Sequence, residues 1–278
     1  MRHAKSEEAA KKAAEFLKKR LPPLMPNPTV GLVLGTGWGD TLQLERVRRI
    51  PFQEIPGFGA LDPLEGHARE VICGTLGEVP VVALRGRIHL NERPADAELH
   101  AMVRLQIEML IQLGVKTLIL TCAAGSLQPE IKVGNIVLIN GFVTIFAPEM
   151  PMFAGEFFSP EDTIDRELMT RIYQLHGPLA LRRGGHVMLR GPFFEGRRYD
   201  KSILRLLVPD GRVGVVGMSV LPEACVASLY PDVRTVPIAF VTNTDSEEHS
   251  HEENQLRAKA QSEHLGNLLA QIISLTPR

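Results

Sequence analysis

Short apolar segments rich in valine, isoleucine and leucine alternate with segments of helical periodicity along this chain. Val30–Leu34, Thr117–Thr121 and Val236–Val241 are almost wholly apolar, as strands buried on both faces are. Between the first two, apolar residues recur with the helical period from about Ala95 to Leu113, and Gly114 follows as a stop signal. Strands that alternate with helices predict an α/β fold with a mostly parallel or mixed sheet covered on both faces.

The remaining elements fit the same alternation. Prolines at 22, 23, 26 and 28 predict an irregular stretch after the first helix, and Ser250 with Glu253 forms a capping box for a final helix. No composition shift marks a linker, so we expect one domain over residues 1–278, with 1–28 as an N-terminal helix and proline-rich lead-in. The other predicted strands are Val79–Leu84, Ile136–Val143, Val187–Leu189 and Val213–Val216, and the other predicted helices are Glu7–Lys19 and Pro222–Leu229.

Charge and cysteine content exclude several classes of protein. The 278 residues carry 31 basic and 32 acidic side chains, a net charge of -1, which argues against an extended nucleic-acid surface. The apolar runs are too short and too often interrupted to span a membrane. Three cysteines in no metal or disulfide pattern predict buried free thiols. No apolar stretch follows the N-terminus, so we expect no secretory signal and a cytoplasmic protein that binds neither membrane nor nucleic acid.

Several segments at predicted strand ends carry groups that can bind an oxyanion. The glycine loop Gly35–Gly39 follows a strand, so its N–H groups can approach an anion closely. Arg87 and His89 are two residues apart in an extended segment and therefore share a face. The small residues Cys122–Gly125 cap a strand and leave N–H groups open, and Ser219 stands at a predicted helix N-terminus. Taken singly, each is equally typical of a tight turn, close packing or a helix cap.

A second group of residues suits a purine nucleoside. Glu195 in a Gly-Pro-Phe-Phe-Glu loop can accept hydrogen bonds from the N1 edge of a purine, and Phe194 offers a flat surface for the base. The amide of Asn243 at a strand end offers a donor and an acceptor for a 6-oxopurine. His251 at a helix start can bond a sugar hydroxyl. Alone, these are also typical of solvated, core or turn residues.

Together these segments resemble the trimeric family of purine nucleoside phosphorylases, which also contains the 5′-methylthioadenosine phosphorylases. The similarity covers the chain from Val30 to Glu253, and the segments occur in the family's order. The resemblance implies a three-layer α/β/α structure around a mixed, partly barrel-like sheet, no metal or organic cofactor, and a homotrimer. The segments are Gly66-His67-Ala68, Arg85-Gly86-Arg87-Ile88-His89, Ala123-Ala124-Gly125, Gly191-Pro192-Phe193-Phe194-Glu195, Val216-Gly217-Met218-Ser219 and Thr242-Asn243.

The resemblance also implies a role for each site residue. Glu195 and Asn243 would hold the base, which Phe194 and Val216 line, while Met218 would lie against the ribose. His251 would reach the 5′-hydroxyl. The catalytic residues would be Asn243, Glu195, His89 and His251. Inorganic phosphate, as co-substrate, would be held by Thr36, His67, Arg87, His89, the Ala123 backbone and Ser219.

The chain departs from the family pattern at three places. Asn91 replaces an aromatic residue that the family usually places against the ribose. The loop 146–159 is poorly matched. In the family this loop supplies an aromatic residue to the sugar site of the neighbouring subunit, and Phe153, Phe157 and Phe158 are all candidates here. Asp245 would contact the base if the end of the preceding strand shifted.

The function that follows is phosphorolysis of purine nucleosides. Asn243 stands where the methylthioadenosine branch usually has Asp, which favours inosine and guanosine. A 5′-methylthioadenosine or adenosine phosphorylase is the alternative within the family, and a non-catalytic purine- or phosphate-binding protein is the alternative outside it. The glycine loop lacks the G-x-G-x-x-G and G-x-x-x-x-G-K-[ST] spacings, which disfavours a nicotinamide-dependent dehydrogenase and an NTPase.

Overall fold

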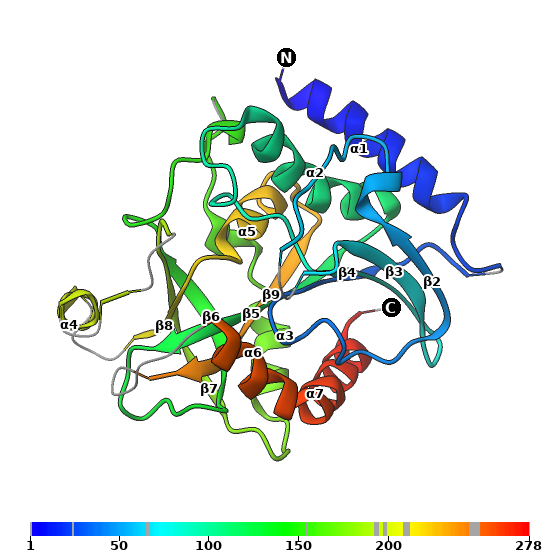
Figure 1. The fold of residues 1–278 in the computed structure, drawn as a ribbon. Helices are drawn as coiled ribbons and strands as arrows, with labels where there is room; N and C mark the ends of the chain where they lie inside the picture. The colour runs from blue at the N-terminus through cyan, green and yellow to red at the C-terminus, as the bar shows by residue number, and fades with distance from the viewer. Residues whose placement is uncertain are drawn as a thin grey trace.

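One mixed sheet organises the molecule (Figure 1). The computed structural model describes residues 2–23, 25–64, 67–153, 155–191, 195–196, 199–207, 212–244 and 251–277. In sheet order the strands are β2, β3, β4, β1, β5, β8, β7, β6 and β9. Their bounds are β1 Val30–Leu34, β2 Glu45–Pro51, β3 Glu70–Leu76, β4 Val79–Arg85, β5 Thr117–Ser126, β6 Ile136–Val143, β7 Leu181–Met188, β8 Val213–Gly217 and β9 Arg234–Asn243.

Part of the sheet closes on itself. Strand β9 pairs antiparallel with β6 and parallel with β5, so that β5, β8, β7, β6 and β9 form a closed ring. Strands β1, β4, β3 and β2 extend the sheet outward from β5. Strand β1 is parallel to both β5 and β4, whereas the β4–β3 and β3–β2 pairs are antiparallel. The predicted mixed, partly barrel-like sheet is confirmed.

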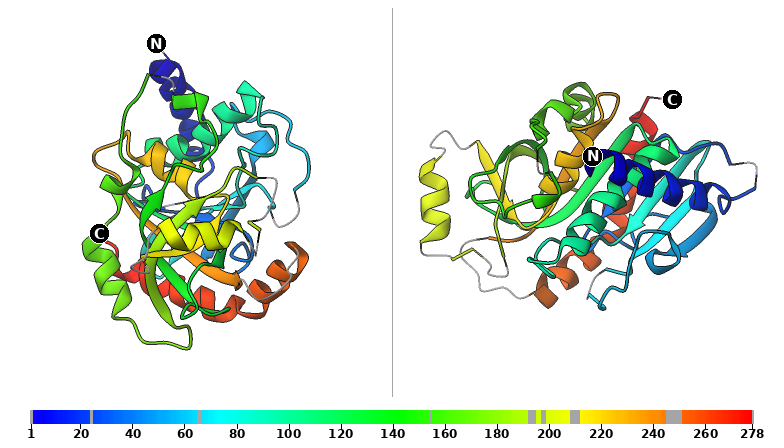
Figure 2. Two further views of the ribbon diagram at one scale, coloured as in Figure 1. Left: turned by 90° about the vertical axis from the view of Figure 1, so that its left-hand side faces the viewer. Right: turned by 90° about the horizontal axis from the view of Figure 1, so that it is seen from above.

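Helices cover the sheet on both sides. The apolar residues of α1, α2 and α5 pack with Val33 of β1, whereas those of α3 and α7 pack with Leu32 and Leu34. This alternation is what the two-residue period of a strand requires when both faces are buried. Figures 1 and 2 show the resulting three layers, with α4 standing at one edge of the molecule. The helices are α1 Arg2–Lys18, α2 Ala97–Leu113, α3 Arg166–Tyr173, α4 Asp200–Leu207, α5 Leu221–Ala227, α6 His251–Ala260 and α7 Ser262–Leu275.

Local sequence signals set the ends of the central helix α2. The Asp96 carboxylate accepts a hydrogen bond from the Glu98 N–H at 2.8 Å, and such N-cap bonds lower the pKa of this carboxyl group. Gly114 ends the helix with φ of 124°, a conformation that favours glycine, and its N–H donates to the Ile111 carbonyl at 3.0 Å. The predicted helix therefore forms within two residues of its expected bounds.

Several features of the fold differ from the sequence prediction, among them α3 and α4, which were not predicted, and β7, which begins at Leu181 rather than Val187. Strands β2 and β3 were not predicted, because most of β2 is exposed and charged and lacks an apolar strand pattern. Strand β5 continues to Ser126, so Ala123–Gly125 lie inside the strand rather than capping it. The predicted single C-terminal helix is two helices, α6 and α7, separated at Gln261. Ser250 of the predicted capping box lies outside the described residues.

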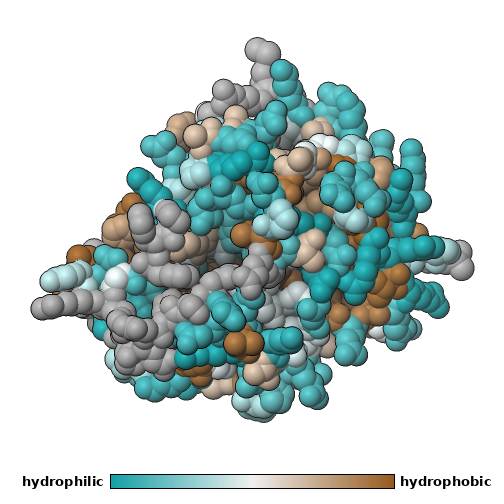
Figure 3. Space-filling model, in the orientation of Figure 1, coloured by the Kyte–Doolittle hydropathy of each residue, from teal (hydrophilic) through white to brown (hydrophobic). Residues whose placement is uncertain are grey.

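The described helices include none that is long and apolar enough to cross a membrane. The face seen in Figure 3 is mainly hydrophilic, and its hydrophobic residues lie in small separate patches.

Candidate active site

A cavity of about 350 Å³ opens where β1, β5, β8 and β9 end, and it brings together segments far apart in the sequence. Of the predicted site residues, ten line it. The other two are Phe194, which lies outside the described residues, and His251, which is the first residue of α6 but whose side chain is not among those the structure describes. The ten are Thr36, His67, Arg87, His89, Ala123, Glu195, Val216, Met218, Ser219 and Asn243.

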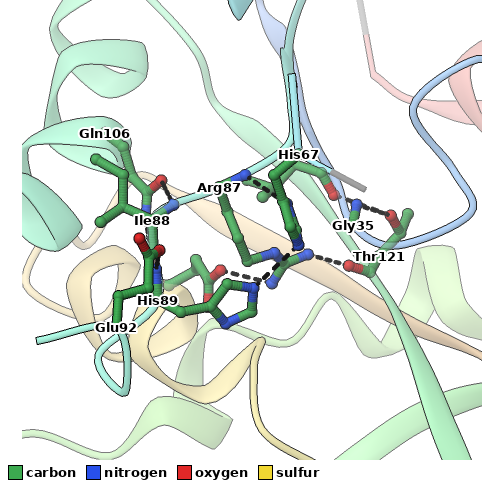
Figure 4. A network of polar contacts seen from close by, with 10 residues as sticks. Gly35, His67, Arg87, Ile88, His89, Glu92, Gln106 and Thr121 are labelled. Carbon is green, nitrogen blue, oxygen red and sulfur yellow. Dashed lines mark hydrogen bonds and ion pairs between the residues drawn. The ribbon is translucent and has the colours of Figure 1, made fainter. Parts of the chain in front are cut away.

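Arg87 is the buried centre of one end of this cavity (Figure 4). Its Nη1 lies 2.6 Å from Glu223 Oε1 on α5, and its Nη2 donates to the carbonyl of Thr121 on β5. Gly35 allows this approach, because a Cβ there would lie 2.8 Å from Nη2 and 2.7 Å from that carbonyl oxygen. The guanidinium is thus fixed by two elements distant in sequence, and the charge of Glu223 balances its own.

His67 and His89 form an edge-on pair beside Arg87, with Nε2 atoms 3.2 Å apart and ring centroids separated by 4.9 Å. The backbone N–H of Arg87 donates to His67 Nδ1 at 3.0 Å. When neutral, His67 must then carry its proton on Nε2 and donate it to His89 Nε2. The two rings are thus held against each other and against the backbone of Arg87 at this end of the cavity.

Ile88, between Arg87 and His89, is hydrogen-bonded through its backbone to Gln106 of α2. Gln106 is fully buried; its Oε1 accepts from the Ile88 N–H at 3.0 Å, and its Nε2 donates to the Ile88 carbonyl at 3.3 Å. One amide side chain therefore satisfies both backbone groups of Ile88. The backbone of His89 is fixed as well, because its N–H donates to Glu92 Oε1 at 2.7 Å.

The glycine loop that carries Thr36 is anchored at Trp38. This side chain is fully buried and its Nε1–H donates to the Cys122 carbonyl on β5 at 3.1 Å. Gly37 has φ of 80°, and a Cβ there would come within 2.0 Å of Ala258 Cβ on α6. Only glycine fits this position. The loop forms turns between β1 and β2 and leads into no helix.

Glu195 and Asn243 meet at the other end of the cavity, over Gly125. A Cβ on Gly125 would lie 2.6 Å from Glu195 Oε1 and 2.8 Å from Asn243 Nδ2. Asn243 ends β9 opposite Gly125 of β5, and its Oδ1 accepts from the Thr242 hydroxyl at 3.2 Å. Its Nδ2 is buried and has no hydrogen-bond partner among the described residues. An unused amide donor beside a carboxylate suits the edge of a nitrogen heterocycle.

Ser219 lines the cavity and lies two residues before α5, so it stands near the predicted helix N-terminus but is not the N-cap, which was the alternative interpretation. The N-cap residue of α5 is Val220, with φ of 77°, an uncommon conformation for a β-branched residue. Such backbone strain is found most often at functional sites. It places Ser219 on the cavity side and Glu223, in the first turn of α5, against Arg87.

Several residues of the site were not predicted from the sequence. Glu92 and Asn254 line the cavity, while Glu223 and Lys201 are buried behind it. Glu92 lies three residues after His89 and Asn254 one helical turn after His251, so spacing alone could have suggested both. No local signal in the sequence marks Glu223 or Lys201, because their partners are distant or in an irregular segment.

The three cysteines are buried, and the structure does not support a nucleophilic role for any of them. Cys73, Cys122 and Cys225 are all buried and free, as predicted. Burial raises the pKa of each thiol to about 12, and Cys122, which lines the cavity, is among them. Among the described residues no group of three His, Cys, Asp or Glu side chains gathers as metal ligands.

Comparison with known proteins agrees with this geometry. Residues 29–274 match the model of the phosphorylase superfamily. Purine nucleoside phosphorylase from Bos taurus is 30% identical over 267 residues, covering 89% of this chain and 88% of that protein. Purine nucleoside phosphorylase 1 from Bacillus subtilis is 28% identical over 241 residues, covering 84% of each.

Solved structures extend the similarity to the fold. Isoform 2 of purine nucleoside phosphorylase from Schistosoma mansoni, in complex with cytosine and ribose-1-phosphate, superposes with a TM-score of 0.81 at 25% identity over 97% of each chain. The Schistosoma mansoni enzyme in complex with inosine gives 0.80 at 26% identity, over 98% of this chain and 97% of that one. The chain belongs to the phosphorylase superfamily and, within it, to the purine nucleoside phosphorylases, which are pentosyltransferases.

Proposed function

We propose that this enzyme cleaves the N-glycosidic bond of purine ribonucleosides and 2′-deoxyribonucleosides with phosphate, and that it favours inosine and guanosine. The products are the free base and (deoxy)ribose 1-phosphate. One observation carries the proposal: a single cavity of about 350 Å³ holds the Arg87–His89 cluster at one end and the Glu195–Asn243 pair at the other. That volume suits a small ligand such as a nucleoside.

The phosphate end would orient the nucleophile. Arg87 is held rigidly by Glu223 and the Thr121 carbonyl, and His89 by Glu92 and the His67 ring. Thr36, Ser219 and the N–H of Ala123 line the same space and can donate to phosphate oxygens. Fixed donors align the anion under C1′ without reorganisation during the reaction, which lowers the barrier.

The base end would stabilise the leaving group. As the glycosidic bond loosens, the sugar gains positive charge and the purine gains negative charge. Asn243 Nδ2, buried and unused among the described residues, can donate to N7 where that charge collects. Glu195 would hold N1–H of the base, Met218 would contact the ribose and Val216 the purine, and His251 would bond the 5′-hydroxyl.

The preference for 6-oxopurines rests on the chemistry of these two side chains. A carboxylate accepts hydrogen bonds, and a 6-oxopurine presents N1–H to it, whereas adenine presents a lone pair at N1. The Asn243 amide can donate to N7 and O6. Both observations favour inosine and guanosine over adenosine and 5′-methylthioadenosine.

A neighbouring subunit would complete the sugar site, and we propose a homotrimer, as the family resemblance implies. Of the three candidates in the loop 146–159, Phe153 is buried and Phe158 packs against the core. Phe157 is 99% exposed. A fully exposed aromatic side chain favours Phe157 as the residue offered to the partner. The three free thiols support a cytoplasmic location for the assembly.

A panel of nucleosides, each with and without inorganic phosphate, tests the proposal. Inosine, guanosine, adenosine and 5′-methylthioadenosine are incubated with the enzyme, and free base and sugar phosphate are measured. We expect phosphate-dependent release of hypoxanthine and guanine, with the two 6-aminopurine substrates slower. Release from 5′-methylthioadenosine faster than from inosine would reassign the enzyme to the methylthioadenosine branch. Base release that is independent of phosphate would refute phosphorolysis.

A further inference from the structure

Behind the base end of the cavity, α4 carries a fully buried lysine. Lys201 Nζ lies 3.2 Å from Glu195 Oε1, and the two side chains are 0% and 5% exposed. Lysine is almost never fully buried unless it is paired. Among the described residues, Glu195 is its ion-pair partner and none makes a hydrogen bond with Nζ. The Lys201 ammonium therefore forms its ion pair with Glu195, the carboxylate proposed to face the base.

The local backbone brings the two groups together. The Gly196 N–H donates to Asp200 Oδ2 at 2.7 Å, and the Lys201 N–H donates to the Gly196 carbonyl at 3.1 Å. These bonds fold the first turn of α4 back onto the residue that follows Glu195. The backbone therefore holds the start of α4 close to Glu195, so that the Lys201 side chain has a short way to its partner.

We propose that Lys201 is a positioning residue that determines base specificity, because its ammonium holds the Glu195 carboxylate aimed at the base. This inference rests on the proposed function. A charged carboxylate can only accept hydrogen bonds, so it binds N1–H of a 6-oxopurine and repels the N1 lone pair of adenine. Lys201 does not line the cavity and acts through Glu195.

Loss of the ammonium would leave Glu195 without the contact that aims it at the base. A carboxylate that can turn away from N1 makes a weaker hydrogen bond to the N1–H of a 6-oxopurine and repels the N1 lone pair of adenine less. The enzyme without Lys201 would therefore lose preference for inosine and gain relative activity on adenosine.

Other charged groups around the site have partners of their own. Asp200 is held by the Gly196 N–H, and Arg257 of α6 donates to the Thr242 carbonyl at 2.7 Å. The remaining ionisable residues that line the cavity form the chain of contacts from Arg87 through His67 to His89 and Glu92. Within the described part of the molecule, Lys201 is the cation at ion-pair distance from Glu195.

The first experiment compares Lys201→Met with Lys201→Arg in the full-length enzyme. The readout is the ratio of kcat/KM for inosine to that for adenosine at saturating phosphate. We expect Lys201→Met to lower this ratio about tenfold or more, because hydrogen bonds to charged groups are among the stronger ones. Lys201→Arg should retain most of the preference. Ile203→Ala, on the exposed side of α4, should leave the ratio unchanged. If Lys201→Met does not fold, Lys201→Gln gives the same comparison.

A double-mutant cycle separates this role from a structural one. Glu195→Gln removes the charge on which Lys201 acts, so adding Lys201→Met to it should change the ratio no further. An unchanged ratio in Lys201→Met, or an equal change with and without Glu195→Gln, would overturn the inference while leaving phosphorolysis intact. If the wild-type enzyme releases no base with phosphate, the proposed function fails, and this inference fails with it.

Discussion

Arg87 and Glu223 form a buried ion pair at the end of the cavity that holds His67 and His89, with Nη1 2.6 Å from Oε1 and side chains that are 1% and 2% exposed. Removal of one member of such a pair leaves the other charge buried without compensation. The pair therefore couples the stability of the fold to the geometry of the active site.

Glu223→Gln should destabilise the protein by about 3 kcal/mol and raise the KM for phosphate, because the guanidinium loses its counter-charge and its fixed position. Urea unfolding and phosphate saturation curves measure the two effects. Asp232→Asn, which removes an exposed ion pair with Lys116, serves as control and should change stability by less than about 0.5 kcal/mol. Equal effects of the two variants would contradict a special role for Glu223.

Asn243→Ala should lower kcat for inosine roughly a hundredfold to a thousandfold, since it removes the donor proposed to stabilise the departing purine. The KM for phosphate should stay close to the wild-type value. Asn267→Ala, at an exposed position of α7, is the matched control. A wild-type kcat in Asn243→Ala would show that another group stabilises the base.

Gly125→Ala should impair nucleoside turnover about a hundredfold, because the new Cβ would displace both Glu195 Oε1 and Asn243 Nδ2 from where they meet. Steady-state kinetics with inosine measure this loss. Gly177→Ala is the control, since a Cβ there meets nothing within 4 Å. Normal kinetics in Gly125→Ala would mean that the two side chains need not converge at this point.

We expect the free energy of unfolding to fall in mild acid because of the buried His186. Burial, with a smaller contribution from the charge of Arg87, lowers its pKa to about 4, and neither ring nitrogen has a hydrogen-bond partner among the described residues. The unfolded chain binds this proton near pH 6.5 and the native state only near pH 4, so stability is lost as the pH falls through that window.

Between pH 7.5 and pH 5 this residue should cost about 2 kcal/mol of unfolding free energy, measured by urea denaturation. His186→Leu should show a correspondingly smaller drop over the same interval. The exposed His176→Gln should behave like the wild type. An identical drop in His186→Leu would assign the acid sensitivity to other groups.

Phe157→Ala should lower kcat/KM for inosine without lowering the thermal stability of the subunit, because the side chain is 99% exposed within its own chain. Light scattering of the wild type and the variant reports whether the assembly itself depends on this residue. Tyr173→Ala, also exposed but on α3, is the control. Unchanged kinetics in Phe157→Ala would remove this side chain from the proposed site.

Most strands were predicted from local apolar patterns, whereas the cavity-lining residues were predicted from the family resemblance of the combined segments. Val30–Leu34 and Ile136–Val143 form strands with the predicted bounds, and His89 and Asn243 stand next to recognisable strand ends. Strand β2 escaped prediction because it lies at the edge of the sheet with exposed charged residues, so no apolar alternation marks it.

Long-range partners could not be predicted. Glu223 is 136 residues from Arg87, and only the tertiary fold brings α5 against the segment that follows β4. The extension of β5 to Ser126 depends on pairing with β8 at Gly125 and Ser126, which the segment itself does not encode. From its sequence, Lys201 looks like a surface lysine in an amphipathic helix. Only the folded structure, in which Gly196 bonds to Asp200, shows that it lies against Glu195.

Strand β9 pairs with a strand on each side, β5 and β6, and its last residue, Asn243, lies opposite Gly125 of β5. A slip that would bring Asp245 into the place of Asn243 is a shift of two residues, which keeps each side chain on its own face but would have to break both ladders at once. If Asn243 and Lys201 set base choice as proposed, a change of base preference would come more easily from one codon at position 243 or 201 than from any movement of the backbone.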